Sequence, residues 1–72
     1  MKTRYKYIHF EPSLSRVPNI WHILTNREDD FLGRIVWYDR WRQYVLDSEL
    51  GSIFSRDCLT DIIDFIKQLE GK

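Results

Sequence analysis

The pattern of apolar and polar positions divides the chain into four extended segments followed by one helix. The extended segments are short runs rich in aromatic and β-branched residues, which is typical of strands. The four predicted strands are residues 5–10, 20–25, 32–38 and 43–46. Residues 11–18 contain two prolines and two serines and predict a loop, and the polar residues 26–30 predict a turn between the second and third strands.

The C-terminal part of the chain has the periodicity of an amphipathic helix. Five apolar residues recur at intervals of three, one, three and three: Leu59, Ile62, Ile63, Ile66 and Leu69. Cys58 and Phe65 widen this apolar face, and the opposite side carries an acidic stripe of Asp57, Asp61 and Asp64. Ser55 is suited to cap the N-terminus, and Gly71 lies where a C-terminal glycine is expected.

The polar link at residues 39–42 predicts a hairpin between the last two strands. A four-residue loop would pair Tyr38 with Gln43, whereas a two-residue loop at residues 39 and 40 would pair Trp37 with Arg42. Directly opposed residues share a face, so both registers place the same four side chains together: Ile35, Trp37, Tyr44 and Leu46. We take this face as the core. The other face then carries Arg34, Val36, Tyr38, Gln43 and Val45.

These elements predict an α+β fold in which an antiparallel sheet of three to five strands packs on one C-terminal α-helix as a two-layer sandwich. The 72 residues are expected to form a single domain, 1–72, because neither half alone would retain a core. Ten residues are expected to be buried together: Trp21, Ile23, Ile35, Trp37, Tyr44, Leu46, Leu59, Ile62, Ile66 and Leu69.

Charge and cysteine content narrow the class of protein. Eleven basic residues balance eleven acidic ones, which disfavours a strongly basic nucleic-acid binder. The single cysteine, Cys58, excludes an internal disulfide and a multi-cysteine zinc site and points to a reducing, cytoplasmic location. No apolar segment has the length of a signal-peptide core or a membrane span, so no membrane partner is expected.

The residues with catalytic or metal-binding potential are few and scattered. His9 and His22 lie on different predicted strands, and Cys58 falls at the edge of the apolar helix face, where a buried and poorly reactive thiol is expected. The acidic residues 28–30 lack the spaced ligands and the glycine of a calcium loop. No phosphate-binding or hydrolase motif is present. We therefore predict no enzymatic activity, no catalytic residues, no metal site and no cofactor.

Three motifs resemble those of a group of small uncharacterised proteins from bacterial genomes and their phages. They are Leu-Gly-Arg-Ile-Val-Trp-Tyr at 32–38, Trp-Arg-Gln-Tyr-Val at 41–45 and Cys-Leu-Thr-Asp-Ile at 58–62. The resemblance covers about the last two-thirds of the chain. It implies a shared fold in a phage-like accessory protein, and it implies no activity and no functional residue.

Aromatic and basic residues concentrate at the predicted hairpin and define the candidate partner-binding residues: Arg34, Tyr38, Arg40, Trp41 and Arg42. Trp, Tyr and Arg are enriched at the centres of protein interfaces. We therefore predict a non-enzymatic interaction module that binds a protein partner or forms a homo-oligomer. In a purely structural interpretation, Trp41 folds back over the core rim, while Arg34 and Arg42 pair with Asp47 and the acidic 28–30 turn.

A second functional interpretation is a nucleic-acid-binding module. Rings stack on unpaired bases and arginine contacts phosphate, so an Arg/Trp/Tyr sheet face is a possible platform for single-stranded nucleic acid. Residues 1–26 add four basic residues against one acidic residue. The zero net charge of the whole chain weighs against this alternative.

Overall fold

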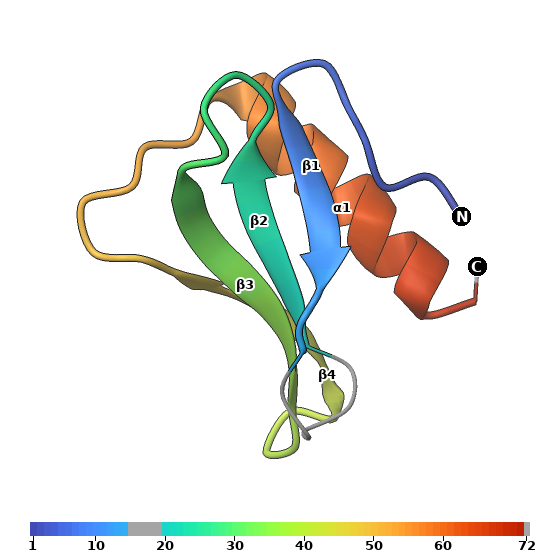
Figure 1. Ribbon diagram of the computed structural model, residues 1–72. Coiled ribbons are helices and arrows are strands. Elements are labelled where there is room, and N and C mark those ends of the chain that lie inside the picture. The colour runs from blue at the N-terminus through green and yellow to red at the C-terminus, as the bar shows by residue number, and fades with distance from the viewer. Residues whose placement is uncertain (15–19, 72) are drawn as a thin grey trace.

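The computed structural model describes residues 1–14 and 20–71, in which a four-stranded antiparallel sheet packs against one C-terminal helix (Figure 1). The elements are β1 (Ile8–Pro12), β2 (Trp21–Thr25), β3 (Phe31–Tyr38), β4 (Gln43–Ser48) and α1 (Arg56–Leu69). The strand order β1-β2-β3-β4 follows the chain. The predicted α+β class and two-layer arrangement are confirmed. None of the helices in the described part of the chain has the length and apolarity needed to cross a membrane.

The first strand differs from the prediction at both ends. Residues 5–7 are not in the strand, because the chain folds back there: Tyr5 donates its backbone N–H to the Ile8 carbonyl, and Phe10 donates to Thr3. Glu11 and Pro12, predicted as loop, instead extend β1. Proline is tolerated there because β1 is an outer strand of the sheet. Of the predicted 11–18 loop, residues 15–18 lie outside the described residues.

The hairpin between β3 and β4 has the four-residue loop, with Tyr38 opposite Gln43 and Ile35 opposite Leu46. The two-residue alternative is wrong. The loop closes through bonds from the Trp41 N–H to the Tyr38 carbonyl and from the Arg42 N–H to Asp39, both 3.2 Å long. β4 also continues to Ser48, two residues beyond its predicted end.

The core lies between α1 and the face of the sheet that carries Phe10, Ile23 and Ile35. Phe65 is its centre: its ring stacks on Phe10 with 4.0 Å between centroids and meets Trp21 edge-on at 5.0 Å. The buried residues of the core are Tyr5, Ile8, Phe10, Ile23, Ile35, Ile62 and Phe65. Trp21, Tyr44, Leu46, Ile66 and Leu69 are half-buried against them. Half of the ten predicted core residues therefore lie at the core margin.

Two predicted core residues, Leu59 and Trp37, are exposed. Leu59 points away because α1 is rotated so that Cys58, Ile62 and Phe65 face the sheet, which also leaves Ile63 exposed. Trp37 is 45% exposed because it lies near the end of the β3–β4 hairpin, which extends beyond α1 (Figure 1). The predicted burial of Leu59 and Trp37 is thus wrong, and Phe65 and the first-strand residues take their place.

Tyr5 joins the N-terminal segment to α1 through its hydroxyl. The hydroxyl donates to Asp64 Oδ2 at 2.7 Å and accepts from Gln68 Nε2 at 2.9 Å. Burial of the ring and the hydrogen bond to the Asp64 carboxylate both raise the pKa of Tyr5 above its ordinary value. The fold therefore favours the neutral phenol. Asp64, one of the three residues of the acidic stripe, therefore stabilises the contact between the N-terminal segment and α1.

We expect Tyr5→Phe to lower the free energy of unfolding at pH 7 by about 1–2 kcal/mol, because the variant loses the charge-assisted hydrogen bond. Because the pKa of Tyr5 is raised in the fold, its contribution is complete below the unfolded value of about 10 and declines as pH rises above it. The difference between the two proteins should therefore shrink above pH ~10. Urea unfolding of both proteins from pH 7 to 11 measures this, and a constant difference across that range would argue against the hydroxyl bond.

Candidate partner-binding surface

The structure divides the five predicted partner-binding residues into two groups. Tyr38 ends β3, and Arg40, Trp41 and Arg42 lie in the following loop, so these four residues gather at the end of the hairpin. We call them the hairpin surface. Arg34 lies four residues earlier on the same sheet face as Tyr38, opposite Asp47 near the far end of β4. It belongs to a different local environment.

Trp41 is the most prominent side chain of the hairpin surface. Its ring meets that of Tyr38 edge-on, with 5.0 Å between centroids and planes at 86°. Trp41 is nevertheless 64% exposed, and Tyr38 is itself exposed. The ring therefore does not cover the core rim, and a large apolar surface remains in water.

A second aromatic pair lies on the opposite side of the same hairpin. Trp37 meets Tyr44 edge-on at 5.2 Å, and the Trp37 indole N–H donates to Asp39 Oδ1 at 3.4 Å. The sequence pattern predicts Trp37 in the core and therefore does not reveal this exposed ring. The alternation of β3 assigns Trp37 to the correct face of the sheet. Its exposure follows from the hairpin, which extends beyond α1 (Figure 1).

The arginines of the hairpin surface differ from Arg34 in their partners. Arg34 Nε donates to Asp47 Oδ2 at 3.0 Å, which is the pairing expected in the structural interpretation. Arg40 and Arg42 make no side-chain hydrogen bond or ion pair to residues 1–14 or 20–71. Arg42 also has a positive φ of 54°, a conformation that favours glycine or asparagine. Two guanidinium groups thus remain available beside Trp41.

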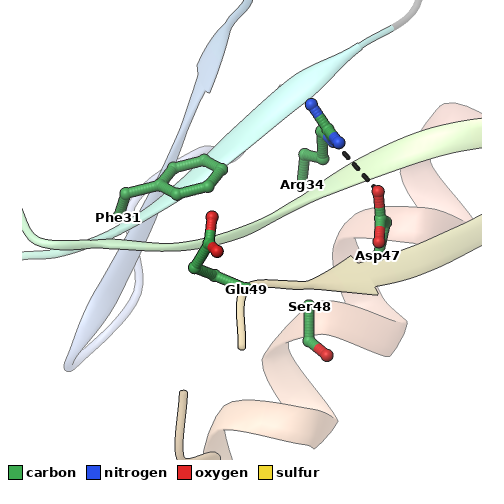
Figure 2. Close-up of a pocket in the computed structure, with 5 residues that line it drawn as sticks. All are labelled: Phe31, Arg34, Asp47, Ser48 and Glu49. Atoms are coloured by element: carbon green, nitrogen blue, oxygen red, sulfur yellow. Dashed lines mark hydrogen bonds and ion pairs between the residues drawn. The ribbon is translucent and has the colours of Figure 1, made fainter. Parts of the chain in front are cut away.

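Arg34 contributes instead to a shallow open pocket of about 250 Å³ (Figure 2). The pocket is lined by Phe31, Arg34, Asp47, Ser48 and Glu49. Its two carboxylates outnumber its single guanidinium, which Asp47 already occupies. This pocket is therefore poorly suited to a phosphate or another anion.

His9 is buried in a polar cluster that the sequence did not indicate. Asn26 Nδ2 donates to the Tyr5 carbonyl, which turns Asn26 Oδ1 toward His9 Nδ1 at 2.7 Å. The other ring nitrogen lies 3.3 Å from Asp29 Oδ1 and 3.6 Å from Glu11 Oε1. The cluster ties the N-terminal segment to the turn after β2. No group of three or more potential metal ligands was found among residues 1–14 and 20–71.

The other two residues considered for catalysis lie in unrelated environments. Cys58 is half-buried in the first turn of α1, where its backbone N–H bonds to the capping Ser55 hydroxyl at 3.2 Å. His22 lies on β2 and packs edge-on against Phe31 at 5.4 Å. The contacts described for Cys58 include neither histidine.

No known family, curated protein or solved structure was found to match the chain. The geometry of the hairpin surface is therefore the basis for a functional assignment. It combines an exposed indole, a neighbouring phenol and two guanidinium groups without a partner in the described part of the chain. Together these groups can bury apolar area and bind carboxylates or phosphates.

Proposed function

We propose that the protein is a small protein-binding module that contacts its partner through the hairpin surface. The observation that carries this proposal is the exposure of Trp41 between two arginines that have no partner among the described residues. Tryptophan and arginine are the residue types most enriched at interface hot spots. The proposal involves no catalytic residue and no cofactor.

Burial of Trp41 by a partner would supply a substantial part of a binding energy. A tryptophan offers roughly 150–250 Å² of surface, and about two-thirds of Trp41 is still in water. At roughly 25 cal/mol per Å², covering that part contributes on the order of 3 kcal/mol. The edge-on contact with Tyr38 already restricts the Trp41 ring, which lowers the side-chain entropy lost on binding.

The charge distribution supports a protein partner more than a nucleic acid. Asp47 pairs with Arg34, and Glu49 adds a second carboxylate near the same open face. The N-terminal segment with Lys2, Arg4 and Lys6 lies at the β1 edge of the sheet, away from the hairpin (Figure 1). Lys2 and Lys6 are placed over tyrosine rings of their own segment. The basic groups of residues 1–14 and 20–71 are thus dispersed rather than gathered into a track for a phosphate backbone.

A photo-crosslinking amino acid in place of Gln43 tests the proposal, because Gln43 is exposed opposite Tyr38 and its substitution leaves Trp41 in place. We expect one discrete protein adduct in cells that express the chain, with its yield lowered about tenfold by Arg40→Ala combined with Arg42→Ala. The same crosslinker in place of Ile63, an exposed apolar position on α1, serves as the matched control and should not give this adduct.

The arginine variant must first show an unchanged circular dichroism spectrum and melting temperature. An adduct that persists unchanged in that variant would mean that the hairpin surface is not the contact. Salt-dependent binding of a single-stranded oligonucleotide, lost in the same variant, would replace the protein partner with a nucleic acid.

A further inference from the structure

The outer edge of β4 has no strand partner among the described residues. β4 pairs only with β3, in a continuous register from Gln43 to Ser48. No backbone hydrogen bond from another described segment reaches its outer side. An edge of this kind presents a row of donors and acceptors to any strand that lies alongside it.

The hydrogen-bond ladder between β3 and β4 determines which backbone groups of β4 point outward. Glu49 donates its N–H to Leu32 at 2.9 Å, so the odd-numbered residues of β4 face β3. The alternation therefore points the N–H and C=O groups of Tyr44, Leu46 and Ser48 away from the sheet.

The other edge of the sheet is protected. The N-terminal segment folds along β1, where Phe10 donates to Thr3 and Tyr5 donates to Ile8, and Pro12 ends the strand without an N–H. β4 contains no proline, no lysine and no bulge. Only the β4 edge is thus suited to pairing.

We propose that two copies of the chain associate by antiparallel pairing of their β4 strands, which joins their sheets into one. The inference deepens the proposed function, on which it rests, by naming the partner of the hairpin surface as a second copy.

Charge complementarity argues for this partner and for this direction. The N-terminal end of β4 follows Arg40 and Arg42, whereas its C-terminal end is followed by the carboxylate of Glu49. Antiparallel pairing brings the basic end of one strand beside the acidic end of the other. Parallel pairing would oppose like charges, which is unfavourable.

The requirement that side chains stay on their own face restricts the register. Opposed residues must both be odd or both be even, so the two-fold axis passes through Val45 or through Leu46. Both registers place Arg42 within one residue of the position opposite Glu49 of the second copy. Arg42 and Glu49 lie just outside β4, and Arg42 has a positive φ, so the alternation within the strand does not assign their side chains to a face. Both registers also place Tyr44 and Leu46 of one copy opposite residues of the other copy's β4 whose backbone groups point outward.

The same antiparallel arrangement brings exposed apolar side chains at one end of β4 beside those at the other end of the second copy's β4. Leu50 and Ile53, in the segment after β4, are 97% and 87% exposed, and Trp41 is exposed at the other end. In either register Trp41 lies within one residue of the position opposite Leu50 of the second copy. The pairing therefore removes exposed side chains of both ends from water.

Sedimentation velocity of the full chain over a range of concentrations tests the association. We expect a monomer–dimer equilibrium that weakens with salt, and a dissociation constant raised about tenfold by Arg42→Glu or by Glu49→Arg. Together in one chain, the two substitutions restore the opposite-charge pair across the axis and should return the constant to about the wild-type value. Arg27→Glu, which makes the same charge change on the turn after β2, should have no effect.

Amide hydrogen exchange gives a second readout. Protection of the Tyr44 and Leu46 amides should rise with protein concentration, whereas that of Val45 and Asp47, which face β3, should stay constant. A chain that remains monomeric at every concentration would overturn the pairing. So would a dimer that responds equally to Arg27→Glu, or one that the combined swap fails to restore. A monomer that still crosslinks another protein through position 43 would reject the pairing while leaving the proposed function intact.

Discussion

Phe65→Ala is expected to lower the free energy of unfolding by about 3–5 kcal/mol, because it empties the centre of the core. Phe65 is completely buried, and it is the ring on which both Phe10 and Trp21 pack. Removal of the ring leaves a cavity between α1 and the sheet. A domain of this size has a total stability on the order of 5–10 kcal/mol, so the variant should be close to unfolding at 37 °C.

Ile63→Ala provides the matched comparison, since Ile63 lies on the same helix but is 54% exposed. Its effect should stay within about 0.5 kcal/mol. Urea unfolding followed by tryptophan fluorescence and by circular dichroism measures both variants. Equal losses for the two would show that the helix does not present the Phe65 side to the sheet.

Gly33→Ala is expected to cost about 2–4 kcal/mol, because two independent penalties coincide at this position. A Cβ atom on Gly33 would lie 2.7 Å from the Asp47 carbonyl oxygen and 2.9 Å from the Ser48 Cα. Both neighbours are backbone atoms of β4, so no side-chain rotation can relieve the contact. The φ of +152° at Gly33 is also a conformation that residues with a side chain rarely adopt.

Gly51→Ala separates the two penalties. Gly51 also has a positive φ, of 85°, but a Cβ there would meet nothing within 4 Å. Its substitution should cost about 1 kcal/mol, through backbone strain alone. Chemical denaturation of both variants gives the comparison, and a Gly33→Ala loss no larger than that of Gly51→Ala would mean that β3 and β4 separate easily at this point.

The candidate surface was partly predictable. Tyr38, Arg40, Trp41 and Arg42 could be grouped because they are close in sequence and lie in one hairpin. Arg34 was grouped with them because it shares their sheet face, but Asp47, thirteen residues later, pairs with it. The alternation of a strand shows which face a side chain takes, and it does not show which partner lies across the sheet.

Buried polar contacts were beyond the reach of the sequence pattern. His9 meets Asn26 and Asp29, and Tyr5 meets Asp64, through contacts that span from 17 to 59 residues. No local spacing encodes such contacts. They depend on how the N-terminal segment folds back along β1 and on where α1 crosses the sheet.

The sequence by itself determined the elements, the hairpin as the place where aromatic and basic residues gather, and the amphipathic character of the helix. These features depend on local backbone periodicity, with two residues per repeat in a strand and 3.6 in a helix. Only the tertiary structure decided which apolar residues are enclosed. The orientation of α1 about its axis buries Phe65 and leaves Leu59 exposed. The hairpin extends beyond α1 (Figure 1), which leaves Trp37 and Trp41 in water. In both cases burial depends on how one layer is placed over the other.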